Sequence, residues 1–108
     1  MALHLKQNPT LRDIQQYVAE LEKDRGFDRN TVLEKYLLLS EEIGELAKCI
    51  RKNASTMRTD SAKHYEFDTA GEFGDILILL SALANRLDVD LEQAFRDKEE
   101  INKKRTWA

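Results

Sequence analysis

The chain has 108 residues, of which 34% are charged, and its formal charges sum to −3. This length suits one domain, and the near balance of charge excludes the basic excess typical of non-specific nucleic-acid binding. The single cysteine excludes an internal disulfide and fits a reducing compartment. The N-terminus lacks a signal-peptide pattern, and the longest strongly apolar run, Ile76 to Leu80, is far too short to span a bilayer. With one proline and four glycines in the whole chain, we expect a single, soluble, cytoplasmic, all-α domain over residues 1–108.

The first two helices are predicted from capping residues and from apolar side chains at helical spacing. Thr10 begins the first helix as part of a near-match to the capping box, and Gly26 is a suitable residue to end it. Thr31 and Glu34 form a second capping box. They open a helix over roughly residues 31–53, in which apolar residues recur every three or four positions.

An irregular segment separates these helices from a third, very apolar one. Residues 54–67 show no periodicity and are expected to form a loop with a helical turn near His64. The third helix begins at Asp68 or the residue after it and ends near Leu87. Within it, Ile76 to Leu80 is apolar on every side, which is typical of a helix that is buried all round. So few helices can hardly surround it, and we expect a second subunit to cover the remaining face.

Acidic side chains lie on the apolar stripes of the second and third helices. Glu42 is in line with Leu39 and Leu46, and Glu72 is in line with Ile76. A buried, unpaired carboxylate is costly, and like charges nearby raise that cost. An acidic run is usually a solvated face, but such faces place a base four residues after each acid, and these acids lack one. We therefore expect a cation between the two helices, among Glu41, Glu42, Glu45, Glu72 and Asp75.

The ligand types favour a hard cation. Carboxylate oxygens without histidine or thiolate suit Mg²⁺, with Mn²⁺ as an alternative. A di-iron site would need Glu-x-x-His motifs, and His4 and His64 are not at that spacing from any of the acids. Zinc lacks its preferred ligands for the same reason.

A last helix is predicted over roughly residues 91–105, capped by Asp90. Its apolar stripe turns polar halfway along and continues as Lys98, Asn102 and Arg105. These side chains could form salt bridges with the acidic helices, or they could bind phosphate oxygens, with the amide fixing the geometry. We favour phosphate binding, because acids, metal, phosphates and bases then form a nearly neutral arrangement.

These motifs resemble those of a known family. Glu41-Glu42-x-x-Glu45, followed after residues 46–71 by Glu72-x-x-Asp75, is similar to the E-E-x-x-E … E-x-x-D signature of the all-α nucleoside triphosphate pyrophosphohydrolases. The chain is most similar to the short, single-domain MazG-like branch, since Lys98-x-x-x-Asn102-x-x-Arg105-x-Trp107 resembles the tail motif of that branch. Phe27, ahead of the acidic helix, also fits. The resemblance spans residues 11–107.

The resemblance implies a bundle of four to five helices, assembled as a homodimer or a dimer of dimers. It implies a Mg²⁺-dependent enzyme that cleaves a nucleoside triphosphate between the α and β phosphates, giving a monophosphate and pyrophosphate. We expect a house-cleaning role and a preference for deoxynucleotides. The implied roles are metal ligation by Glu42, Glu45, Glu72 and Asp75, orientation or deprotonation of water by Glu41, base stacking by Phe27, and substrate binding by Lys98, Asn102 and Arg105.

Two other interpretations stay open. The chain could be a pyrophosphohydrolase of another nucleotide, such as phosphoribosyl-ATP, or a non-catalytic helical oligomer whose acids bind cations structurally. Pyrophosphate release in the presence of Mg²⁺ separates the enzymes from the structural protein. A preference for phosphoribosyl-ATP would separate the two enzymes.

Overall fold

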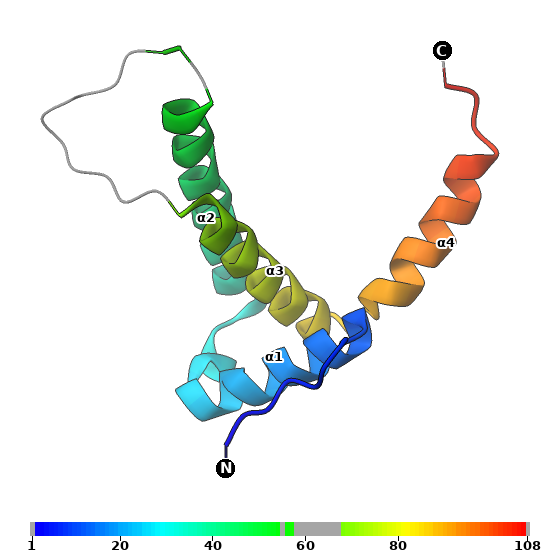
Figure 1. Cartoon of the computed structure of the whole chain (residues 1–108). Coiled ribbons are helices and arrows are strands. Elements are labelled where there is room, and N and C mark those ends of the chain that lie inside the picture. The colour runs from blue at the N-terminus through cyan, green and yellow to red at the C-terminus, as the bar shows by residue number, and fades with distance from the viewer. Residues whose placement is uncertain (1, 55, 58–67, 108) are drawn as a thin grey trace, which may run out of the picture.

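A computed structural model describes residues 2–54, 56–57 and 68–107. These residues form four α-helices and one 3₁₀ turn, and the predicted all-α class is confirmed (Figure 1). Each predicted helix is present, although the last one ends two residues earlier than expected. The helical turn predicted near His64 lies outside the described residues. The elements are α1 (Leu11–Arg25), η1 (Phe27–Arg29), α2 (Val32–Asn53), α3 (Thr69–Arg86) and α4 (Leu91–Lys103).

The ends of the first two helices follow from the predicted caps. At the start of α1, the Asp13 backbone N–H donates to Thr10 Oγ1 over 3.1 Å, and the Thr10 N–H donates to Asp13 Oδ2 over 2.8 Å. Thr31 and Glu34 form the same capping box on α2, with the same two distances. Gly26 ends α1 with φ 75°, a left-handed conformation that costs least without a Cβ. The near-match at Thr10 is thus a complete capping box, in which aspartate replaces the usual glutamate.

The buried core cluster lies between α1 and α3. Figure 1 shows α2 and α3 side by side, with α1 crossing below them. Val18 and Leu21 of α1 pack against Ala82 in the C-terminal half of α3, and all three are almost completely buried. This leaves the N-terminal half of α3, which carries the second acidic pair, to pack against α2. In the described parts of the chain, no helix is long and apolar enough to cross a membrane.

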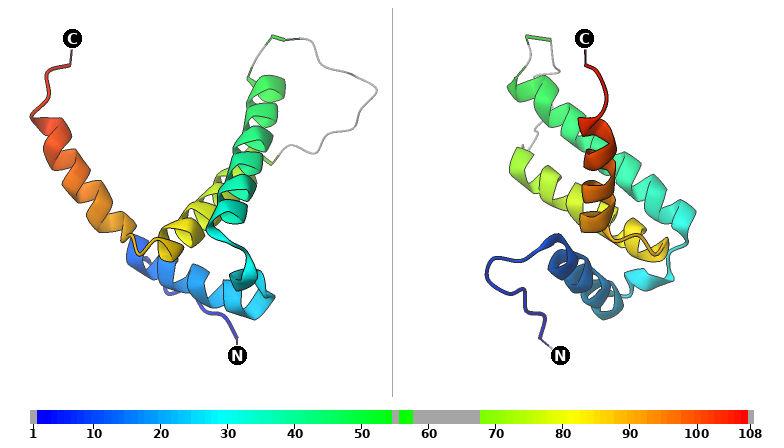
Figure 2. Two further views of the ribbon diagram at one scale, coloured as in Figure 1. Left: turned by 180° about the vertical axis from the view of Figure 1, so that it is seen from behind. Right: turned by 90° about the vertical axis from the view of Figure 1, so that its right-hand side faces the viewer.

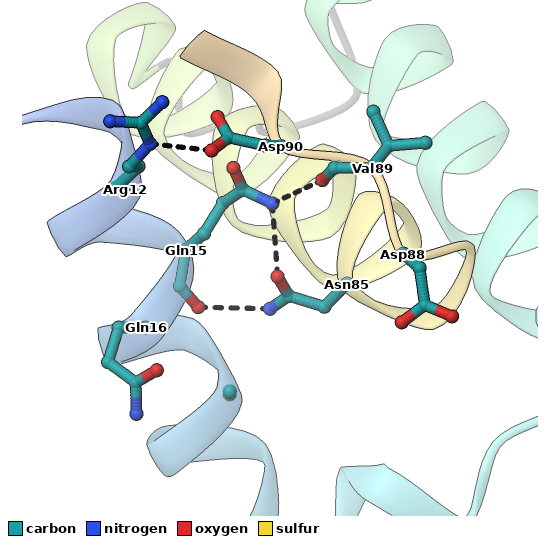
Figure 3. Close-up of a pocket in the computed structure, with 8 residues that line it drawn as sticks. Arg12, Gln15, Gln16, Asn85, Asp88, Val89 and Asp90 are labelled. Carbon is teal, nitrogen blue, oxygen red and sulfur yellow. Dashed lines mark hydrogen bonds and ion pairs between the residues drawn. The ribbon is translucent and has the colours of Figure 1, made fainter. Parts of the chain in front are cut away.

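The fourth helix diverges from the other three and forms one arm of an open V (Figures 1 and 2). A polar network at its N-terminal end fixes the connection from α3. Gln15 Nε2 donates to Asn85 Oδ1 over 3.0 Å and to the Val89 carbonyl over 2.8 Å (Figure 3). The Leu91 N–H donates to Gln15 Oε1 over 2.8 Å. The Asn85 amide returns a hydrogen bond to the Gln15 carbonyl over 2.9 Å. The direction of α4 is therefore set by hydrogen bonds at one end and not by packing along its length.

Because of this divergence, one chain covers the segment Ile76 to Leu80 only in part, and the second subunit expected over its remaining face stays a prediction. In the single chain, four of these residues are half-buried, and Leu80 is 40% exposed. The next helix in sequence, α4, does not cover them, and its own Phe95 is 68% exposed. Apolar side chains on both arms of the V therefore have room for a further packing partner.

Candidate functional site

The antiparallel pairing of α2 and α3 brings the two acidic motifs together. Glu42, Glu72 and Asp75 each offer one carboxylate oxygen, and the three oxygens lie within 4.8 Å of one another. They line an open cavity of about 700 Å³, which we call the acid pocket. Its lining consists of Glu41, Glu42, Gly44, Glu45, Lys48, Glu72 and Asp75. All five of the predicted acids therefore border one cavity.

The acids are less buried than the predicted core-facing stripes of the two helices would make them. Glu42 and Glu72 are half-buried, whereas Glu41, Glu45 and Asp75 are exposed. The physical reason is that α1 packs against the other end of α3 and α4 points away, so this end of the α2–α3 pair is open. Glu45 has a cation nearby, since Lys48 Nζ lies 3.8 Å from its carboxylate.

The electrostatics of the acid pocket fit a bound cation. A hydrogen bond with Glu72, burial and the negative charges of Asp75, Glu72 and Glu45 raise the pKa of Glu42 to about 7. Glu72 Oε2 is buried and has no hydrogen-bond partner among the described residues. An unsatisfied buried carboxylate oxygen is costly unless a cation or donor meets it. An all-oxygen donor set of this kind is the set that Mg²⁺ prefers, so the residues fit the metal implied by the sequence.

A second, smaller cavity adjoins the acid pocket. It has a volume of about 220 Å³ and shares Glu42 and Asp75 with the acid pocket. Phe27 lines it, so the structure brings the predicted stacking residue to the same two carboxylates; we call this cavity the Phe27 pocket. The remaining walls are Leu21, Glu22, Arg25, Lys35, Ile78, Leu79 and Ala82.

Two residues of the Phe27 pocket were missed by the sequence analysis. Glu22 and Lys35 form an ion pair whose side chains are 6% and 3% exposed. The helical pattern contained a signal for both. Glu22 is four residues after buried Val18, and Lys35 is four residues before buried Leu39, so each charge falls on a core-facing stripe. Opposite charges on two packed stripes indicate a buried pair.

The predicted phosphate-binding residues are not brought to the acid pocket within one chain. Lys98 and Asn102 line a different, mainly apolar cavity of about 420 Å³ between α3 and α4. Arg105 instead packs on Trp107, with its guanidinium carbon 4.4 Å from the ring centroid. In the described parts of the chain, neither Lys98 nor Arg105 forms a salt bridge with α2 or α3, so the alternative of an internal salt bridge receives no support.

Comparison with known proteins places these motifs in a family. Residues 27–106 match the model of the MazG nucleotide pyrophosphohydrolase domain. The chain is 32% identical over 98 residues to the dATP/dGTP diphosphohydrolase of Salmonella phage PMBT28, a match that covers 91% of this chain and 28% of that protein. It is 36% identical over 100 residues to dCTP pyrophosphatase 1 of Mus musculus, which covers 90% of this chain and 59% of that protein.

The fold agrees with a solved structure as well. The crystal structure of YPJD from Bacillus subtilis, a candidate pyrophosphatase, matches with a TM-score of 0.76 at 29% identity. That match covers 94% of this chain and 100% of the other. The chain spans less than two thirds of the length of the two curated relatives, but the family model covers most of the chain itself. The chain belongs to the MazG nucleotide pyrophosphohydrolase domain family.

Proposed function

We propose that the chain is a Mg²⁺-dependent enzyme that cleaves deoxynucleoside triphosphates to the monophosphate and pyrophosphate. The observation that carries the proposal is the cluster of three carboxylate oxygens within 4.8 Å, beside a cavity lined by an aromatic ring. Family membership supports the reaction. Two relatives are named for dATP, dGTP and dCTP, which supports the deoxynucleotide preference. A house-cleaning role is part of the proposal.

We assign the metal to the acids of α2 and α3. Glu42, Glu72 and Asp75 would hold it, because their oxygens converge, and Glu45 would contribute from the next turn of α2. When bound, Mg²⁺ supplies positive charge that neutralises the phosphate oxygens and stabilises the leaving pyrophosphate. Binding would also keep Glu42 ionised despite its raised pKa, since the cation replaces the proton.

Glu41 is the candidate for handling the attacking water. It lines the acid pocket but is exposed and does not belong to the convergent cluster. A carboxylate that stays outside the metal ligands can accept a hydrogen bond from water and orient it toward phosphorus. In this role Glu41 removes or directs a proton and does not hold the nucleotide.

Phe27 would hold the nucleoside end of the substrate. The Phe27 pocket shares two acids with the acid pocket, so a nucleotide with its phosphates at the acids has its base within reach of the ring. The Phe27 side chain is about half exposed, and base–aromatic stacking is favourable for every base.

We also propose that the active form is a homodimer or a dimer of dimers. One chain leaves Phe95 and Leu80 exposed and keeps Lys98 and Arg105 away from its own acids. An isologous assembly could bury the apolar faces and bring α4 of one copy to the acids of another. Light scattering at low micromolar concentration should therefore report an oligomer, and a stable, active 12.5 kDa monomer would contradict this part of the proposal.

The main test is a panel of nucleotides assayed for pyrophosphate release with Mg²⁺ and with EDTA. Deoxynucleoside triphosphates should release pyrophosphate with Mg²⁺ and none with EDTA. Phosphoribosyl-ATP and ribonucleotides belong in the same panel, since a preference for either would replace the proposed substrate. Release of orthophosphate instead of pyrophosphate would exclude cleavage between the α and β phosphates.

A further inference from the structure

The ion pair beside Phe27 is more deeply buried than the other charged residues of its pocket, Arg25, Glu42 and Asp75. The other walls of the Phe27 pocket include apolar Ile78, Leu79 and Ala82. Glu22 comes from α1 and Lys35 from α2, so the pair joins two helices in the wall of the cavity. Burial of two charges carries a desolvation penalty, and apolar residues of similar volume often give a more stable protein. Stability is therefore a weak reason for these two residues.

The pair keeps hydrogen-bonding capacity that a ligand could use. An ammonium group has three N–H donors, and a carboxylate has two acceptor oxygens. Within the described residues, the partners of Lys35 are Glu22 and the ring of Phe27, whose centroid lies 5.6 Å from Nζ. A donor and an acceptor thus lie side by side next to an aromatic ring. A flat heterocycle held against that ring would present its polar edge to both groups.

We infer that the Glu22–Lys35 pair selects the base of the substrate and favours guanine. Guanine has a carbonyl oxygen beside a ring N–H and an amino group, so it offers one acceptor to Lys35 and two neighbouring donors to Glu22. Adenine and cytosine offer the carboxylate a single amino group, and thymine offers a single ring N–H. A site built to pair with a polar edge rejects analogues that leave its buried groups unpaired. The inference rests on the proposed function, because it requires a nucleotide substrate.

The test compares the wild-type chain with two double variants. Glu22→Leu with Lys35→Met removes both buried charges at similar volume, so neither charge is left unpaired. Glu100→Gln with Lys103→Met is the matched control, since it removes an exposed ion pair of α4 whose atoms are 2.9 Å apart. Each protein is assayed for pyrophosphate release from dGTP, dITP and dATP. Binding of dGMP, dIMP and dAMP is measured by calorimetry, which requires no turnover.

We expect the wild type and the control to favour dGTP over dITP and dATP by about ten- to a hundredfold in kcat/KM, the effect of one charge-assisted hydrogen bond. The three monophosphates should follow the same ranking in Kd. Glu22→Leu with Lys35→Met should remove the ranking in both measurements.

An unchanged ranking in that variant would overturn the inference, and so would a wild type that cleaves dGTP and dITP with equal kcat/KM. The latter comparison needs no variant and decides the matter even if the double variant does not fold. If the wild type cleaves no triphosphate, the proposed function fails, while the monophosphate ranking still tests base selection.

Discussion

The α2–α3 pair and α4 differ in the sign of their charge and in how much of their surface is packed. α2 and α3 lie side by side (Figure 1) and hold a converging set of three carboxylates, in a pocket lined by five acids and one cation, Lys48. α4 carries the cations Lys98 and Arg105, but it is held at one end and leaves Phe95 and Ile101 more than half exposed. The α2–α3 pair is packed along its length but has an excess of negative charge, whereas α4 carries cations and is packed at one end only. Each surface offers the chemistry that the other lacks, which is the physical reason for expecting metal, nucleotide and a second copy to bring them together.

Removal of the carboxylates that we propose as metal ligands should have the largest effect. We expect kcat to fall by about a hundredfold or more in each of four variants: Glu42→Gln, Glu45→Gln, Glu72→Gln and Asp75→Asn. Even the loss of a residue that only hydrogen-bonds to a metal ligand typically lowers metal affinity or activity by about ten- to a hundredfold. Circular dichroism should show an unchanged helical fold. Full activity in any two of the four variants would contradict the metal site and leave the α2–α3 pair without a catalytic role.

A change at Glu41 should separate turnover from binding within the same region. If Glu41 orients or deprotonates water, Glu41→Gln should lower kcat by about a hundredfold, with little change in nucleotide affinity. Steady-state kinetics and calorimetry with the monophosphate measure the two quantities. Weaker binding with normal turnover would make Glu41 a substrate or metal ligand instead.

Changes in α4 should affect all substrates alike. Lys98→Ala and Arg105→Ala should each weaken the binding of every triphosphate by about 1.5–3 kcal/mol, the free energy of a lost charge-assisted hydrogen bond. Because phosphate contacts carry no information on the base, the ranking of bases should not change. A lower melting temperature without nucleotide, at unchanged affinity, would favour a salt-bridge role and would remove the reason for placing α4 near the acids of another copy.

The sequence was sufficient for the local structure and insufficient for the placement of α4. Thr10, Thr31 and Asp90 mark helix starts through contacts with residues three positions away, so the caps could be read from the chain. The sequence also predicted that the two acidic motifs meet, because each lies on an apolar stripe and needs a positive partner. In contrast, the direction of α4 depends on the Gln15–Asn85 network, which joins residues 70 positions apart. Helical periodicity contains no information on such a contact.

The smallest expected effect concerns the stability of the metal-free chain and tests the crowding of charge between α2 and α3. The folded chain raises the pKa of Glu42 from its ordinary value of 4.5 to about 7, so between these values the folded state binds more protons than the unfolded state. The free energy of unfolding should therefore fall as pH rises from about 4.5 to 7, and the contribution of Glu42 should be lost above that range.

Melting curves in EDTA should show the wild type losing several degrees in melting temperature between pH 5 and pH 8, whereas Glu42→Gln, which cannot ionise, should lose less. The capping carboxylates Asp13 and Glu34 act in the opposite direction, because hydrogen bonds from backbone N–H groups lower their pKa values and their contribution is lost only toward acid pH. Parallel curves for the two proteins would show that the acids are not crowded in the folded chain, and the case for a cation at this end of α2 and α3 would then rest on activity alone.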